Sequence, residues 1–118
     1  MKKKCTQKVV YISGPIKDVP KYWKPFEKME DEFSAKGFIV LTPTRLPEGL
    51  TEAQSTRIRT AMIDSADAVY FLPGWYTDDA SVLEHQHAHH IGKVSLYGAV
   101  DDALRYWHAI TKEVPRIE

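Results

Sequence analysis

Short apolar runs alternate with helical patterns along this chain of 118 residues, and this alternation constrains the fold more than any other feature. Each of the first three runs stops at a turn that contains proline, such as Gly14-Pro15, which is typical of a buried strand. Strands that alternate with helices form parallel βαβ units. The expected strands cover residues 8–13, 38–41, 68–72 and 94–96.

The segments between these strands carry apolar residues at helical spacing. The first stripe ends at Gly37, a usual C-terminal glycine, and comprises Tyr22, Phe26, Met29 and Phe33. Thr51 and Gln54 form a capping-box pattern, which predicts the start of a second helix that continues through Ile58 and Met62. Two further helices are expected, one over residues 79–91 and one with an apolar face of Val100, Leu104, Trp107 and Ile110.

The predicted fold class is therefore α/β: a three-layer sandwich with a mostly parallel sheet and helices on both faces, Rossmann- or flavodoxin-like. The length of the chain favours a single domain over residues 1–118, with residues 1–7 as a flexible N-terminal tail. In such sheets, ligands bind at the carboxyl ends of the strands. We therefore look for the site in the loops at 13–20, 42–49 and 73–79.

Charge and composition exclude several classes of function. Sixteen basic residues balance sixteen acidic ones, which argues against a nucleic-acid polymer or an anionic membrane as partner. No run approaches the roughly 20 apolar residues of a membrane span, and the basic start is followed by polar residues rather than by a signal-peptide core. The single cysteine, Cys5, excludes an intrachain disulfide. A cytoplasmic protein is expected.

The first loop offers a hydroxyl at Ser13, followed by Gly14 and Pro15. Gly14 either lets the backbone approach a ligand closely or simply forms a turn with Pro15, and the sequence leaves both interpretations open. The loop is neither a phosphate-binding P-loop nor a dinucleotide fingerprint, because the required lysine and further glycines are absent.

The segment 73–84 runs from a strand end, through a loop that contains Asp78, into a helix. Glu84 shares a helix face with Ala88 and Ile91, so its side chain is expected to point toward the sheet. A buried glutamate without a partner is rare, so the alternative is a side chain that reaches solvent or pairs with a basic neighbour. Trp75 either stacks against a base or anchors the loop.

Histidines are dense on the same helix, at His85, His87, His89 and His90. Two of them four residues apart could share a metal ion, but the HExxH order is absent and a polar solvated helix face explains them as well. We therefore predict neither a metal site nor a cofactor.

Several of these pieces, in this order and spacing, resemble the nucleoside 2-deoxyribosyltransferase superfamily, and within it a branch of small phage and bacterial proteins. The resemblance covers about residues 8–97. The matching segments are Tyr11-Ile12-Ser13-Gly14-Pro15, Gly37, Pro43, Ala66-Asp67-Ala68-Val69, Leu72-Pro73-Gly74-Trp75, and Glu84 with Ala88 and Gly92.

This resemblance implies an enzyme that cleaves or exchanges the N-glycosidic bonds of nucleosides or nucleotides. Glu84 would be the nucleophile and form a glycosyl-enzyme ester, which water or a second base resolves. Tyr11 would contact and orient Glu84. The resemblance also implies a homo-oligomer, a dimer or larger. Residues expected to contact the substrate are Ser13, Gly14, Pro15, Arg59, Gly74, Trp75, Asp78 and Ala80.

Two of these positions bear on the substrate. Relatives that act on nucleosides carry an aspartate at the place of Asp78, which accepts from the sugar's 5′-hydroxyl, so a free 5′-hydroxyl is expected here. Arg59 stands where many relatives carry an aspartate that positions or protonates the leaving base, and Ala80 replaces a usual glycine. Because Arg59 could keep Glu84 ionised or bind a phosphate, a protein that binds a nucleotide without cleaving it is the alternative function.

Overall fold

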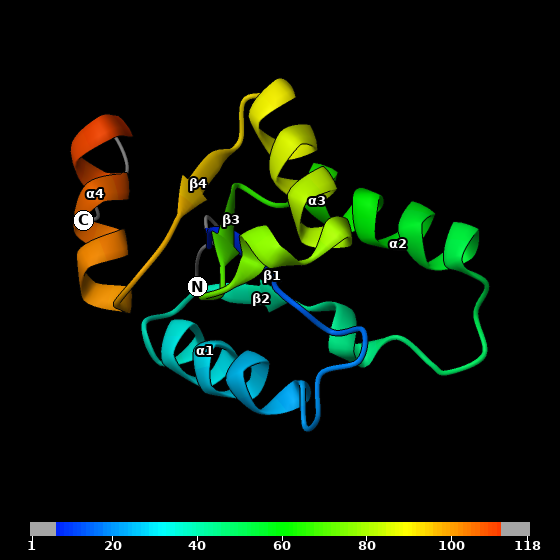
Figure 1. The fold of residues 1–118 in the computed structure, drawn as a ribbon. Coiled ribbons are helices and arrows are strands. Elements are labelled where there is room, and N and C mark those ends of the chain that lie inside the picture. The colour runs from blue at the N-terminus through cyan, green and yellow to red at the C-terminus, as the bar shows by residue number, and fades with distance from the viewer. Residues whose placement is uncertain (1–6, 112–118) are drawn as a thin grey trace.

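The computed structural model describes residues 7–111 of the chain and contains a four-stranded sheet (Figure 1). The strands are in the order β2-β1-β3-β4, and each neighbouring pair is parallel. The predicted parallel α/β sheet is confirmed. Its members are β1 (Val9–Ser13), β2 (Ile39–Leu41), β3 (Ala68–Phe71) and β4 (Val94–Leu96).

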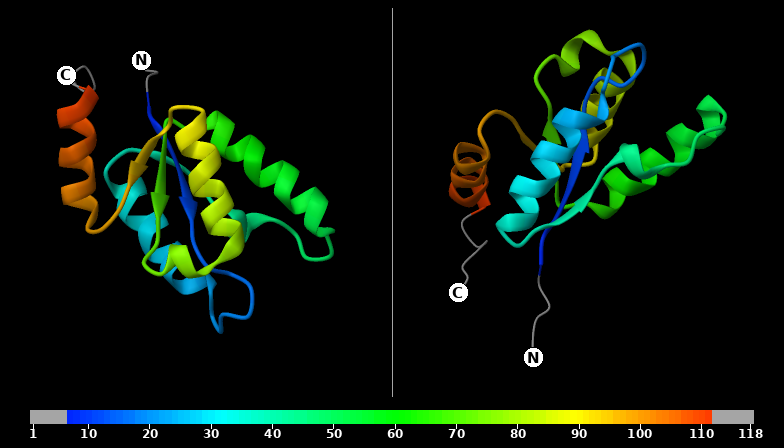
Figure 2. Two further views of the ribbon diagram at one scale, coloured as in Figure 1. Left: turned by 45° about the horizontal axis from the view of Figure 1, so that its top comes forward. Right: turned by 90° about the horizontal axis from the view of Figure 1, so that it is seen from below.

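Four α-helices cover the two faces of this sheet, which confirms the three-layer sandwich (Figure 2). Helices α1 (Trp23–Ala35) and α4 (Val100–Thr111) lie on one face, and α2 (Glu52–Ser65) and α3 (Asp79–His90) lie on the other. Two short 3₁₀ turns, η1 (Pro43–Arg45) and η2 (Trp75–Thr77), follow β2 and β3.

Side chains of β1 alternate between the two faces, as the two-residue repeat of a strand requires. Val10 and Ile12 are fully buried beneath α1 and α4, whereas Tyr11 is fully buried beneath α2 and α3. The core on the first face is the larger, and its buried members are Val10, Ile12, Phe26, Met29, Phe33, Ala68, Tyr70, Leu72, Leu96, Val100, Ala103 and Trp107. The second core contains Tyr11, Ile63, Ala66, Val69, Phe71 and Ala88.

The predicted element boundaries differ from the structure by one residue in most places. Tyr22 is the N-cap of α1 rather than part of its apolar stripe, and it contacts Trp23 edge to face. The predicted capping box of α2 is present, with a 3.0 Å hydrogen bond from the Gln54 amide to the Thr51 hydroxyl and a reciprocal one of 2.9 Å. Of the predicted tail, residues 1–6 lie outside the described residues.

The connections after β1 and β3 leave the sheet on opposite faces, because β1 leads into α1 and β3 leads into α3. Such a switch point between neighbouring parallel strands opens a crevice at their carboxyl ends. The Leu72 amide donates to the Ser13 carbonyl over 2.9 Å and extends the pairing of the two strands to this edge. None of the helices within residues 7–111 has the length and apolar character needed to cross a membrane.

Candidate active site at the ends of β1 and β3

The Glu84 carboxylate lies against the sheet although it is ionisable. Glu84 is in the second turn of α3, is only 9% exposed, and shares its helix face with the buried Ser81 and Ala88. This confirms the predicted inward direction. Ile91, expected on the same buried face, is 38% exposed, because it is the C-cap residue at which the chain leaves α3.

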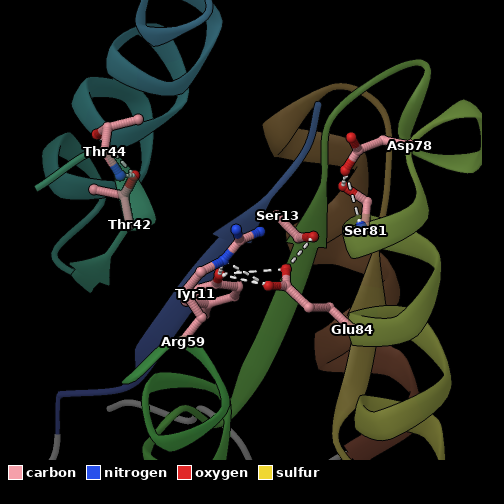
Figure 3. Close-up of polar contacts among 8 residues, drawn as sticks. All are labelled: Tyr11, Ser13, Thr42, Thr44, Arg59, Asp78, Ser81 and Glu84. Carbon is pink, nitrogen blue, oxygen red and sulfur yellow. Dashed lines mark hydrogen bonds and ion pairs between the residues drawn. The ribbon is translucent and has the colours of Figure 1, made fainter. Parts of the chain in front are cut away.

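Two side chains of β1 donate to this carboxylate (Figure 3). The Ser13 hydroxyl donates to Oε1 over 2.7 Å, and the Tyr11 hydroxyl lies 3.3 Å from Oε1 and 3.2 Å from Oε2. Tyr11 and Ser13 are two residues apart and therefore project from the same face of the strand. Both are fully buried, so the strand presents two fixed donors to Glu84.

Arg59 of α2 completes the cluster. Its Nε lies 2.8 Å from Glu84 Oε2 and 3.4 Å from the Tyr11 hydroxyl, and its side chain is 14% exposed. The sequence alternative in which Glu84 pairs with a basic neighbour is therefore what the structure shows. One guanidinium nitrogen, Nη2, is buried and has no hydrogen-bond partner among the described residues.

Charge and burial set the protonation of this cluster. Burial, together with the charge of Glu84, raises the pKa of Tyr11 well above its usual value, so its phenol remains a proton-bearing donor. Burial lowers the pKa of Arg59, but the charge of Glu84, the electrostatic effect of Tyr11 and the hydrogen bonds to both side chains together raise it by more. The guanidinium thus stays charged, and the cluster unites one positive and one negative group with neutral donors.

All four residues of the Glu84 cluster lie in the part of the chain that one protein-family model matches. The family described as domain of unknown function DUF4406 matches residues 8–97, from β1 to β4. This chain belongs to the DUF4406 family. No curated protein matched it in sequence.

Among solved structures, this DUF4406 chain is similar to one described as a 2-desoxiribosyltransferase from Leishmania mexicana. The two share 22% sequence identity and superpose with a TM-score of 0.64 over 76% of this chain. The match spans 63% of that protein's length. The expected resemblance to the deoxyribosyltransferase superfamily is thereby confirmed for the fold.

Asp78 lies apart from the Glu84 cluster, at the N-terminus of α3 (Figure 3). It caps the helix through Oδ2, which accepts from the Ser81 amide over 2.9 Å and from the Ser81 hydroxyl over 2.8 Å. Its other oxygen, Oδ1, has no hydrogen bond to the residues that the structure describes. Ser81 was not predicted as a partner, although aspartate is a preferred N-cap residue that accepts from the amide three residues later.

Gly14 is a glycine because of packing across the sheet edge. A Cβ atom at Gly14 would lie 2.6 Å from Cδ1 and 2.9 Å from Cβ of Leu72, closer than real side chains allow. Neither sequence interpretation, ligand approach or turn geometry, included this cause, because Leu72 is remote in the sequence. Pro15 follows it and is half-buried.

The loop after β3 is anchored by aromatic contacts. Gly74 has a φ of 83°, a left-handed conformation that favours glycine, and it begins η2. The Trp75 ring stacks on His85 with centroids 4.2 Å apart and also contacts Phe71, so this ring anchors the loop. Ala80 is exposed in the first turn of α3.

Two of the four histidines of α3, His85 and His87, each have a separate hydrogen-bond partner. His85 Nε2 is 2.7 Å from the Tyr97 hydroxyl, and His87 Nε2 is 2.9 Å from Asp64 Oδ1. Within residues 7–111, no group of three or more histidine, cysteine or acidic side chains is placed to hold a metal ion. The loop after β2 contributes a separate hydrogen-bonded pair, Thr42 and Thr44, outside the Glu84 cluster (Figure 3).

Proposed function

We propose that this protein cleaves or exchanges the N-glycosidic bond of nucleosides, with Glu84 as the nucleophile. The observation that carries the proposal is the buried Glu84 carboxylate, which Ser13, Tyr11 and Arg59 hold at the carboxyl ends of β1 and β3. A group fixed in this way loses little freedom when it reacts, and it lies where parallel sheets bind ligands.

The proposed reaction has two displacements. An oxygen of Glu84 attacks the anomeric carbon of the sugar, and the carbon–nitrogen bond breaks with its electron pair on the base. Water or a second base then attacks the same carbon and frees the Glu84 carboxylate. Tyr11 and Ser13 orient the carboxylate as hydrogen-bond donors, and the raised pKa of Tyr11 supports a phenol that keeps its proton.

The sugar's 5′ end is assigned to Asp78 in this proposal. Oδ2 of Asp78 is occupied by Ser81, and Oδ1 is available to accept from a free 5′-hydroxyl. A 5′-phosphate would bring a second negative charge to the same carboxylate, so nucleosides should bind better than their 5′-monophosphates. Gly14, Pro15, Gly74 and Trp75 belong to the loops around this edge, and Ala80 lies in the first turn of α3. We propose these five residues as the pocket lining.

A second candidate is a protein that binds a nucleotide without cleaving it. The ion pair between Arg59 and Glu84 favours this candidate. The guanidinium lies 2.8 Å from Oε2 and so engages one of the two carboxylate oxygens that could act as the nucleophile. In a binding protein, the same pair would supply a fixed donor and acceptor to the ligand.

One experiment separates the two candidates. The protein is incubated with a panel of nucleosides and 5′-monophosphates, free base is followed by chromatography, and binding is measured by calorimetry on the same panel. Base release supports the enzyme, whereas binding without release supports the second candidate. A 2′-deoxy-2′-fluoro nucleoside should trap the glycosyl ester, seen as a mass increase of the intact protein that Glu84→Gln lacks and the exposed-site control Glu52→Gln retains.

A further inference from the structure

The charge of the Glu84 cluster changes when the proposed ester forms. In the resting protein, the positive Arg59 lies 2.8 Å from the negative Glu84, and their side chains are 14% and 11% exposed. An ester at Glu84 is neutral, so Arg59 would remain as a mostly buried cation that has lost its counter-ion. Such an unpaired buried charge is strongly unfavourable unless another negative group takes the place of the carboxylate.

The cluster also holds no suitable proton source for the departing base. Among residues 7–111, no second carboxyl group and no imidazole is bonded to Tyr11, Ser13, Arg59 or Glu84. Burial is the largest cause of the raised pKa of Tyr11, and it persists when Glu84 loses its charge, so the phenol keeps its proton. Arg59 does not release a proton at ordinary pH, so it can act on the base only as a cation and a hydrogen-bond donor.

Arg59 has donor capacity that the resting protein does not use. Its Nε serves Glu84 and Tyr11, while the buried Nη2 has no partner among the described residues. A buried donor without an acceptor is costly, and a ligand acceptor would remove that cost. A negatively charged acceptor on the substrate would therefore pair with the Arg59 cation after Glu84 is esterified, and it would also accept a hydrogen bond from Nη2.

We propose that the leaving base departs as an anion and that Arg59 becomes its counter-ion. This inference rests on the function proposed above. As the bond from Glu84 to the anomeric carbon forms, the electron pair of the breaking carbon–nitrogen bond moves to the base. Negative charge thus passes from Glu84 to the base, Arg59 pairs with each in turn, and no proton is transferred.

The substrate class follows from this charge transfer. Bases with acidic ring N–H groups, which carry negative charge most easily, should be the best leaving groups. A guanidinium can donate two hydrogen bonds to adjacent acceptors, such as O6 and N7 of an oxo-purine. Adenine has an amino donor in place of O6, so it offers only one of these acceptors. The preferred substrates are therefore nucleosides of oxo-bases, with hypoxanthine favoured over adenine and electron-poor uracils over uracil.

The test compares leaving groups that differ in acidity but barely in shape. The value of kcat/KM is measured for 2′-deoxyuridine and 5-fluoro-2′-deoxyuridine with wild type, Arg59→Gln, Arg59→Lys and the exposed control Arg57→Gln on the same helix. Arg59→Gln should lower kcat/KM for 2′-deoxyuridine by about 10²-fold, and for the more acidic fluorouracil by roughly tenfold less. Arg59→Lys should lie between, and Arg57→Gln should match wild type.

Equal losses for both substrates would overturn the inference, because Arg59 would then act only by positioning Glu84. If circular dichroism shows that Arg59→Gln is unfolded, wild type alone decides: it should release hypoxanthine from 2′-deoxyinosine with at least roughly tenfold higher kcat/KM than adenine from 2′-deoxyadenosine. An equal or reversed preference overturns the inference. Wild type that releases no base from any nucleoside overturns the proposed function itself, which is a different result.

Discussion

The two faces of the sheet differ in what they bury. The face under α1 and α4 is filled by apolar and aromatic side chains, among which Phe33 contacts Tyr70 and Phe38 edge to face. The face under α2 and α3 has a smaller apolar core and also buries Glu84 with its three polar partners. One strand, β1, serves both faces with alternate side chains.

This difference indicates how a small domain can hold a charged pair away from water. Apolar burial contributes roughly 25 cal/mol per Å², so the larger apolar core of the first face stabilises the fold more than the smaller core of the second. A buried ion pair contributes little net stability, but removal of one partner leaves an unpaired charge at a cost of about 3–5 kcal/mol. The second face therefore holds the charged pair and depends on the first for much of its stability.

Replacement of Glu84 by Gln tests the face under α2 and α3 most strongly. The substitution keeps the side-chain shape but removes the charge of the proposed nucleophile, so base release should fall by about 10⁴-fold or more. Chromatographic assay of base release measures this, with Glu52→Gln as an exposed control. Chemical denaturation should also show a loss of about 3 kcal/mol, because Arg59 loses its counter-ion. A variant that keeps a tenth of wild-type turnover would exclude Glu84 as nucleophile.

Replacement of Phe33 by Ala tests the other face and should reverse this pattern. Phe33 is fully buried between the sheet and α1, and removal of its ring leaves a cavity. The free energy of unfolding should fall by about 3–5 kcal/mol, measured by urea denaturation. The folded fraction should retain kcat/KM close to wild type. A large loss of activity in fully folded Phe33→Ala would show that the two faces are coupled.

Much of the fold could be predicted because its signals are local. The strands were visible as short apolar runs, and the capping box of α2 needs only the pattern at Thr51 and Gln54. The inward direction of Glu84 could also be predicted, because its spacing from Ala88 is that of one helix face. Each of these inferences uses residues that lie within a few positions of one another.

The remaining features depend on contacts between distant segments. The packing cause of Gly14 lies in Leu72, and the partner of Glu84 lies in α2. The position of Arg59 did carry a signal, because it is four residues before Ile63 and seven before Ala66, both buried on the same stripe. Helical spacing thus indicates that Arg59 points inward. Only the packing of α2 beside α3 shows that its ion-pair partner is the Glu84 carboxylate.

Replacement of Asp78, at the N-terminus of α3 and apart from the Glu84 cluster, should have a smaller effect. Asp78→Ser keeps a good helix N-cap but removes the charge, so folding should change little. The preference for nucleosides over 5′-monophosphates should shift toward the monophosphates by about 1–3 kcal/mol, measured as kcat/KM for matched pairs. Wild type that already prefers the monophosphate, with no change in Asp78→Ser, would indicate that Arg59 binds the phosphate instead.

The smallest expected effect concerns the histidines of α3. His85 contacts Tyr97 and the Trp75 ring, and His87 pairs with Asp64, so these two imidazoles already have partners. A metal that binds the folded chain but not the unfolded chain raises the free energy of unfolding, and removal of that metal lowers it. Dialysis against EDTA should therefore leave both the melting temperature and base release unchanged. A lower melting temperature after dialysis, which added zinc raises again, would show that these side chains rearrange to bind metal.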